Sequence, residues 1–191
     1  MKKQAEKTAQ TKENLTQAFW WHYCKKRIEH ITVKDITERA GYNRSTFYEY
    51  FTDVYDVLEQ LEDSLINYIR ENVLESLDTN SMMNLPSHLA NVYDSIGNYL
   101  SVLLGENGNP RFTGKIKNAM RAAILNAFGI KKIDSRTMLI YEFALSAILG
   151  TLTYWYQNRD IASSDELVVL VRSMLMNGPA YEIKRTLTDM F

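Results

Sequence analysis

Residues 32–51, TVKDITERAGYNRSTFYEYF, contain signals that start, end and restart a helix within a short stretch of chain. Thr32 and the acidic Asp35 three positions later have the form of a capping box, which starts a helix. Gly41 readily adopts the left-handed conformation that ends a helix, and Asn43 is a preferred N-cap for the next one. The segment therefore predicts a helix-turn-helix.

The apolar residues of this segment are spaced to hold both helices against a core. Ile31 and Ile36 occupy the positions of a hydrophobic staple around the predicted cap. Ile36 and Ala40 lie one helical turn apart, and the small Ala40 suits a close helix crossing. Phe47 and Phe51, also one turn apart, are expected to anchor the second helix. Its other side chains are therefore predicted to be exposed or partly exposed.

Those other side chains have the chemistry that reads double-stranded DNA. In a helix-turn-helix, the start of the second helix faces base edges in the major groove. Arg44 can pair bidentately with guanine, and Thr32 lies at a positive helix end that can hold a phosphate. The alternatives are an ordinary surface role for Arg44 and a packing role for Tyr48. The predicted DNA-binding residues are Thr32, Asn43, Arg44, Ser45, Thr46, Tyr48 and Tyr50.

The rest of the chain also has helical periodicity, so an all-α fold is predicted. With 8 Gly and 3 Pro in 191 residues, a loop-rich or all-β chain is disfavoured. Residues 105–110, GENGNP, form the clearest break, and a capping box from Ser163 to Glu166 starts the last long helix. Residues 1–14 are predicted to form a solvated arm. The expected helices cover 12–26, 32–40, 43–51, 53–77, 86–104, 111–129, 134–158 and a stretch after Ser163.

The stretch 134–158 is apolar nearly all round, which is typical of a helix buried on more than one side. We expect its second partner to be its own copy across a two-fold axis. A dimer would also place two recognition helices about 34–36 Å apart on one side of the DNA. Aromatic side chains of the C-terminal part are expected to form the core, with a ligand cavity as the alternative; they are Tyr68, Tyr93, Tyr99, Phe112, Phe128, Tyr141, Phe143, Tyr154, Trp155 and Tyr156.

Charge is unevenly distributed along the chain, although the net charge is only −1. Residues 1–51 hold ten Lys and Arg and six Asp and Glu, a net charge of +4. Residues 52–191 hold twelve and seventeen, a net charge of −5. A basic end on an acidic body suits a protein that offers one end to a polyanion.

Composition and motifs argue against several other classes. Cys24 is the single cysteine, so no internal disulfide is expected and a cytoplasmic location is predicted. A buried structural role is favoured for Cys24, with a redox sensor as the alternative. Phosphate-binding loops and nucleophile motifs are absent from the sequence, so we predict no enzymatic activity, catalytic residue or cofactor. His22, His30 and His88 lack metal-ligand spacing, and no apolar run approaches the length of about 20 residues that spans a membrane.

The N-terminal segment resembles the DNA-binding domain of the tetracycline-repressor (TetR) family. The resemblance implies a three-helix domain in residues 1–51, and a helical bundle for ligand binding and dimerisation in residues 52–191. Helix 53–77 would link the two. The stretch from Trp155 to Gly178 resembles, more weakly, the helices that build the dimer interface in many members. The residues that carry the main resemblance are Ile31-Thr32-Val33, Asp35-Ile36, Ala40-Gly41, Ser45-Thr46-Phe47-Tyr48 and Tyr50-Phe51.

The resemblance implies a transcription regulator that binds a palindromic operator as a homodimer. It implies repression and release by a small-molecule effector of unspecified chemistry. Two departures leave an alternative open: Val54, followed by Tyr55, stands where the family often has a phosphate-binding lysine, and Tyr42 replaces a small aliphatic residue. The alternative is a relative with weakened DNA binding that acts through protein–protein contacts. A small helical enzyme is the second alternative, and it requires a polar pocket with converging titratable groups in the C-terminal part.

Overall fold

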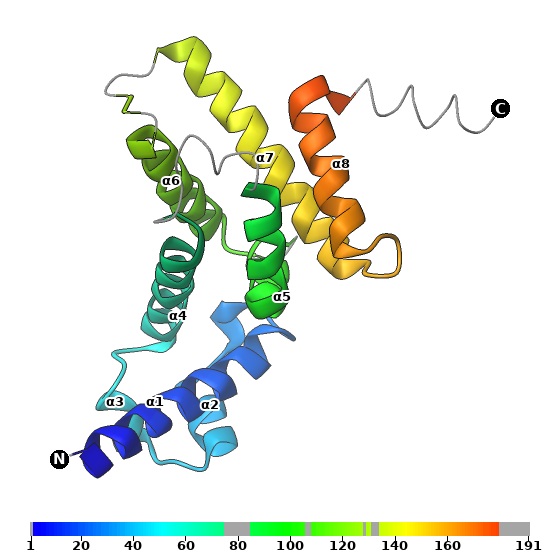
Figure 1. The fold of residues 1–191 in the computed structure, drawn as a ribbon. Coiled ribbons are helices and arrows are strands. Elements are labelled where there is room, and N and C mark those ends of the chain that lie inside the picture. Colours follow the sequence, from blue (N-terminus) through cyan, green and yellow to red (C-terminus); the bar gives the residue numbers. More distant parts are fainter. Residues whose placement is uncertain (1, 75–84, 106–107, 128, 131–133, 180–191) are drawn as a thin grey trace. The chain divides into compact units, whose positions relative to one another are not determined.

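The computed structural model describes the chain except for residues 1, 75–84, 106–107, 128, 131–133 and 180–191. The described residues contain helices and no strand, so the predicted all-α fold is confirmed. The chain divides into two compact units, Met1–Leu65 and Ile66–Phe191 (Figure 1).

The N-terminal unit is built from α1 (Lys2–Tyr23), a 3-10 turn (Ile28–His30), α2 (Val33–Ala40), α3 (Arg44–Tyr48) and the first part of α4 (Val54–Ile69). The prediction of a solvated arm over residues 1–14 is wrong, because α1 already begins at Lys2. Residues 2–14 are rich in Lys, Glu, Gln and Ala, which are strong helix formers. They therefore extend the helix that the buried residues of α1 anchor. The fully buried side chains of this unit include Leu15, Phe19, Ile36, Phe47 and Val57.

The C-terminal unit contains the end of α4, a π-helical stretch (Arg70–Leu74), α5 (Leu85–Leu103), α6 (Pro110–Ala127), α7 (Ser135–Gln157) and α8 (Ser164–Asn177). The predicted continuation of α4 over residues 75–77 lies outside the described residues. α5 packs against both α7 and α8. Gly97 makes the crossing of α5 and α7 close, because a Cβ there would collide with the ring of Tyr156. The hydroxyls of Tyr93 and Thr153 form a buried hydrogen bond of 3.0 Å between these helices.

α7 has two apolar faces with different surroundings. Its inward stripe, which includes Leu145, Leu152 and Trp155, is buried. Its opposite stripe is exposed, with 65% of Phe143 and 62% of Tyr154 accessible to solvent. Within the single chain α7 is therefore buried on one side, and the expected burial of its other side against its own copy stays a prediction. By length and composition alone, α7 would also pass for a membrane span, as apolar helices of soluble proteins often do.

Candidate nucleic-acid interface

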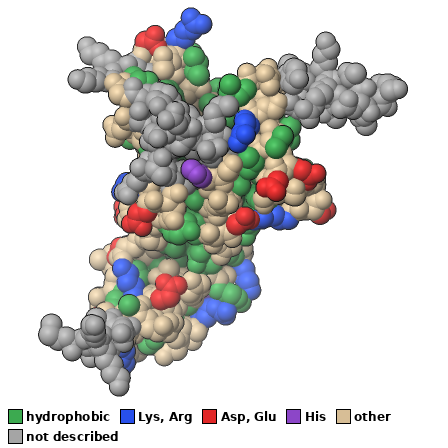
Figure 2. Space-filling view, viewed as in Figure 1, with side chains coloured by type: hydrophobic (Ala, Val, Ile, Leu, Met, Phe, Trp, Pro, Cys, Tyr) green, Lys and Arg blue, Asp and Glu red, His purple; other side chains and the backbone are tan. Residues whose placement is uncertain are grey.

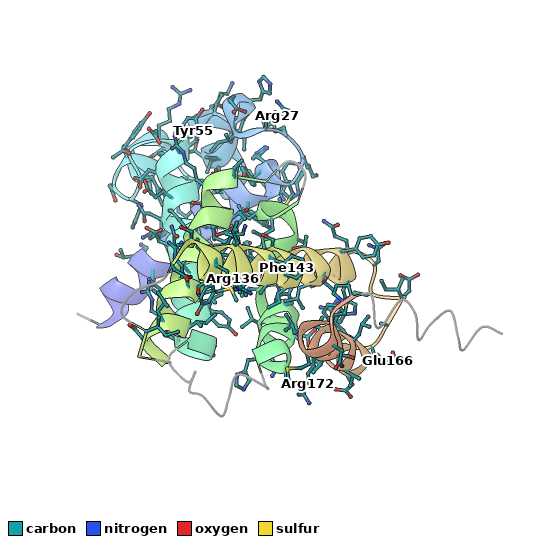
Figure 3. All side chains as sticks on the ribbon, turned by 90° about the horizontal axis from the view of Figure 1, so that it is seen from above. Arg27, Tyr55, Arg136, Phe143, Glu166 and Arg172 are labelled. Carbon is teal, nitrogen blue, oxygen red and sulfur yellow. The ribbon has the colours of Figure 1, made fainter. Side chains whose placement is uncertain are left out.

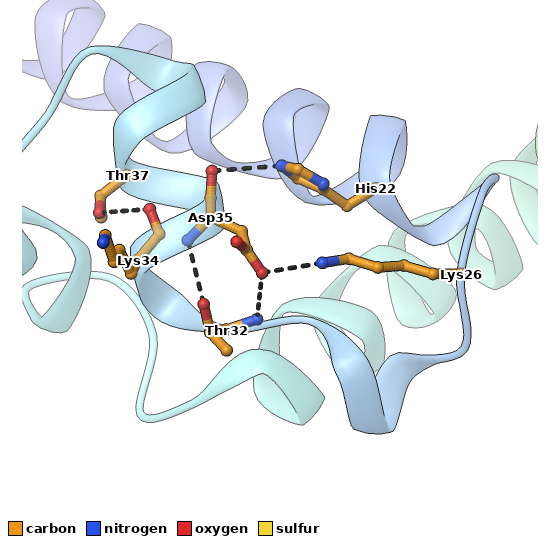
Figure 4. Close-up of polar contacts among 6 residues, drawn as sticks. All are labelled: His22, Lys26, Thr32, Lys34, Asp35 and Thr37. Atoms are coloured by element: carbon orange, nitrogen blue, oxygen red, sulfur yellow. Dashed lines mark hydrogen bonds and ion pairs between the residues drawn. The ribbon is translucent and has the colours of Figure 1, made fainter.

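The start of α2 is fixed by the predicted capping box and by a connection to α1 (Figure 4). The amide of Asp35 donates to the Thr32 hydroxyl at 3.1 Å, and the amide of Thr32 donates to the Asp35 carboxylate at 2.9 Å. Lys26 of the preceding loop lies 2.9 Å from the same carboxylate oxygen. The His22 ring, on α1, contacts the Asp35 carbonyl at 3.2 Å. Lys26 and the Thr32 amide hold the pKa of Asp35 at about 2.

The turn between α2 and α3 has the geometry that its glycine predicts. Gly41 has φ 74° and ψ 28°, the left-handed conformation that ends a helix. The next residue, Tyr42, is half-buried, and its hydroxyl accepts a hydrogen bond of 3.0 Å from Asn14 of α1. Tyr42 therefore ties the turn to α1, which explains why a large residue is accommodated here.

The polar residues at the start of α3 form a local network around Asn43. The Asn43 Oδ1 atom accepts hydrogen bonds from the Thr46 amide at 2.9 Å, the Thr46 hydroxyl at 2.9 Å and the Ser45 hydroxyl at 2.7 Å. The prediction that Asn43 caps this helix is confirmed. In this arrangement the hydroxyl hydrogens of Ser45 and Thr46 are both donated to Asn43. Each hydroxyl oxygen can then only accept further hydrogen bonds. Such groups suit the amino groups of adenine and cytosine better than phosphate oxygens.

The other three predicted DNA-binding residues of α3 and its exit differ in exposure. Arg44 is exposed, and 58% of Tyr48 is accessible to solvent. Tyr50 is half-buried, and its carbonyl accepts a hydrogen bond of 3.3 Å from Gln60 of α4. Arg44 and Tyr48 are therefore open to a partner, whereas Tyr50 is partly covered. Figure 2 shows Lys and Arg side chains at the surface of the same N-terminal unit.

The start of α4 carries carboxylates instead of a lysine. Val54 is buried, whereas 53% of Tyr55, which is labelled in Figure 3, is accessible to solvent. The Asp53 carboxylate accepts hydrogen bonds from the amides of Tyr55 at 2.8 Å and Asp56 at 2.9 Å. The backbone amides at the start of α4, which have no partner within the helix, thus already donate to a carboxylate of the chain itself.

The sequence did not predict the side chains that connect α1 and the following loop to α2 and to the turn after it. His22, Lys26 and Asn14 each bond to a residue more than eight positions away along the chain. Their residue types alone gave no signal. His22 and Lys26 are one helical turn apart in sequence and lie on the α2 side, a pattern that could have indicated a contact across the loop.

Cys24 differs from its prediction. Its side chain is exposed, so the predicted burial is wrong. Partial desolvation nevertheless raises the pKa of its thiol, against the effect of the neighbouring Lys25 charge, so it lacks the low pKa that a redox sensor needs. In the described ranges, no group of three or more His, Cys, Asp or Glu side chains is placed to hold a metal ion.

Solved structures with similar architecture cover nearly the whole chain, whereas no protein-family model and no curated protein matches its sequence. A TetR transcriptional regulator from Streptococcus agalactiae 2603V is 20% identical, covers 90% of this chain and 97% of its own, and superposes with a TM-score of 0.64. This chain has the TetR fold.

Two further structures with this architecture are as similar. The fatty acid degradation regulator FadR from Bacillus halodurans is 17% identical, with 88% of this chain and 96% of its own chain covered and a TM-score of 0.62. A TetR-family transcriptional regulator from Streptomyces coelicolor is 16% identical, with 91% and 83% covered and a TM-score of 0.63. The TetR fold combines an N-terminal helix-turn-helix with a C-terminal helical domain, so the predicted architecture is confirmed.

Proposed function

We propose that this protein is a sequence-specific DNA-binding transcription regulator. The observation that carries the proposal is the pair of capped helices around Gly41, with Arg44 and Tyr48 exposed on the second helix. Thr32, Asn43, Ser45, Thr46 and Tyr50 complete the proposed contact set. The TetR fold supports the same function, because residues 31–51 also resemble the DNA-binding segment of that family.

Gel shifts with DNA from upstream of the protein's own gene test this proposal. Arg44→Ala should weaken operator binding by about 1–3 kcal/mol, the usual contribution of a bidentate arginine–guanine pair. Arg111, an exposed arginine at the start of α6, provides the matched control, and Arg111→Ala should leave operator binding unchanged. Failure of the wild-type protein to bind at low salt would favour the alternative, a relative that acts through protein–protein contacts.

We further propose that the protein acts as a homodimer that joins through α7 and α8. The exposed stripe of α7 combines Leu139, Phe143 and Tyr154 with the small residues Ala147 and Gly150. A Cβ on Gly150 would meet no atom within 4 Å, so the single chain does not require a glycine there. Small residues between large apolar ones allow two helices to approach closely, and a continuous exposed apolar patch is typical of an interaction surface. α8 adds the exposed Val169, Leu170 and Met176.

Light scattering on the purified protein tests the dimer. Phe143→Glu should shift the protein to the monomer because it buries an unpaired charge at the interface. Ile161, which is exposed in the connection between α7 and α8, provides the control, and Ile161→Glu should remain dimeric. A wild-type protein that is monomeric at all concentrations would contradict the proposal.

The remaining elements of the proposed function are repression, a cytoplasmic location and release from a palindromic operator by a small-molecule effector. They are supported by the TetR fold and by the expected roles of the two segments, DNA binding for residues 1–51 and ligand binding and dimerisation for residues 52–191. An effector that binds the DNA-free conformation better must lower operator affinity by the same factor. Candidate ligands that raise the melting temperature should therefore also dissociate the operator complex, and ligands that do only the first would argue against this mechanism.

A further inference from the structure

A second surface of the N-terminal unit lies along α1 and α2. An open groove of about 630 Å³ is lined there by side chains that include Asn14, Trp21, Cys24, Lys25 and Arg39. A volume of this size is in the range of pockets that bind drug-sized ligands, about 300–1,000 Å³. The groove is therefore large enough to receive several side chains of a partner.

Two cations are held over one indole ring in this groove. The Lys25 Nζ atom lies 3.3 Å from the centre of the Trp21 ring, and the Arg39 guanidinium carbon lies 3.7 Å from it. Trp21 itself is 39% exposed. Cation–π contacts position the charged groups but leave N–H donors of both free to bond to an oxygen ligand. Positioned cations bind an anion with a smaller loss of side-chain entropy.

The nearby acidic side chains do not neutralise these cations. In the part of the chain that the structure describes, neither Lys25 nor Arg39 forms an ion pair. The acidic residues of α2 are engaged elsewhere, because Asp35 binds Lys26 and Glu38 lies 3.6 Å from Lys34. The groove therefore presents two positive charges placed over one partly exposed aromatic ring.

We propose that this groove binds an acidic peptide segment of a partner protein. Carboxylate side chains would pair with Lys25 and Arg39, whose cations lie over the Trp21 ring, and an apolar side chain of the peptide would contact the exposed edge of that ring. An open groove suits an extended peptide, whose neighbouring residues remain in solvent, better than a small molecule that needs enclosure. The complementarity of charge gives the interaction its selectivity for acidic sequences.

The position of Arg39 separates this groove from the proposed DNA-reading surface. Arg39 follows Asp35 by one helical turn, so both lie on the side of α2 that faces α1. Thr32 lies at the opposite end of α2, and Arg44 belongs to α3. Contact of the groove with DNA flanking the operator is the competing possibility, and the operator-binding measurement below distinguishes it.

Fluorescence anisotropy with a labelled peptide that alternates glutamate and leucine tests the proposal on the full-length protein. The wild type should bind this peptide at low salt and should not bind the same peptide with glutamine in place of glutamate. Arg39→Gln and Lys25→Gln should each weaken binding about tenfold, as expected for loss of a close charge pair. Lys34→Gln, which removes an exposed cation of the same helix outside the groove, should leave binding unchanged.

Each contrary result overturns the proposal. Absence of peptide binding, equal binding of the glutamine peptide, or an equal loss in Lys34→Gln would show that no acidic-peptide site exists here. Loss of operator binding in Arg39→Gln without loss of peptide binding would assign the groove to DNA. Arg44→Ala should lose operator binding and keep peptide binding, so failure of the peptide site and failure of the proposed DNA-binding function can be told apart.

Discussion

The starts of α2 and α4 use similar residues and yet present opposite charge to an approaching phosphate. At α2, Thr32 and Asp35 form the cap, and Lys26 neutralises the carboxylate at 2.9 Å. At α4, the Asp53 carboxylate caps the helix, and the Asp56 carboxylate accepts a hydrogen bond of 2.8 Å from the Thr52 amide. No ion pair to Asp53 or Asp56 is found in the described part of the chain.

The difference teaches that a helix start is a phosphate site only when its cap is neutral overall. The positive end of a helix dipole amounts to about half an elementary charge, so one unpaired carboxylate outweighs it. By this reasoning α2 can receive a phosphate beside Thr32, whereas α4 repels one. The start of α4 therefore carries the carboxylates of Asp53 and Asp56 and, with Val54, no lysine beside them.

The largest expected effect comes from removing the carboxylate at α2. Asp35→Ala eliminates both the return hydrogen bond of the capping box and the Lys26 ion pair, and should destabilise the protein by about 1–2 kcal/mol. Asp56→Ala, its counterpart in α4, should cost about 1 kcal/mol or less, because no ion pair is lost. Urea denaturation of both variants checks the order, and equal losses would remove the basis of the comparison.

Acid should affect the two helix starts differently. The pKa of Asp35 is about 2 in the folded protein, below its usual 3.8, because Lys26 and the Thr32 amide stabilise the charged form. Its contribution to stability is therefore full above the usual pKa and is lost as the pH falls from about 5 towards 2. Asp35→Asn should reduce the fall in melting temperature over this range. An unchanged acid transition would show that the Lys26 contact is not maintained in solution.

Neutralising the cap of α4 should strengthen DNA binding. Asp53→Asn keeps a good N-cap residue and removes one negative charge, so operator affinity should rise about two- to fivefold at low salt, and the gain should shrink as salt screens the charge. Filter binding over a salt series measures both. Unchanged affinity at low salt would mean that α4 lies away from the phosphate backbone.

The smallest effect is expected at Lys34. Its contact with Glu38 is 3.6 Å long, and both side chains are largely exposed. Exposed pairs of this spacing contribute about 0.3–0.5 kcal/mol, so Lys34→Gln should change the free energy of unfolding by no more than that. A loss comparable to that of Asp35→Ala would indicate that the start of α2 depends on this pair as well.

Local signals in the sequence are sufficient to predict the helix-turn-helix. The caps at Thr32, Asn43 and Ser163 and the left-handed Gly41 depend on residues within four positions of one another, and the structure has all of them. The anchoring role of Phe47 was equally readable, because helical spacing alone indicates which side faces the core.

Contacts between residues far apart along the chain could not be predicted from the sequence. Nothing in the sequence pairs Lys26 with Asp35 across the intervening loop, or Asn14 with Tyr42. The exposure of Cys24 is not readable either, because a small apolar side chain beside Trp20 and Trp21 has the pattern of a buried residue. The roles of the predicted DNA contacts stay predictions, because side-chain exposure alone does not identify a bound base.

Gly150 has a consequence for how the protein would respond to dilution. A glycine inside a helix destabilises it by about 0.5–1 kcal/mol relative to alanine, and nothing in the single chain fills the space beside it. If two α7 helices meet at this point, the folded chain regains stability only on association. The melting temperature should then rise with protein concentration, and the protein's lifetime in the cell would depend on how much of it has been made.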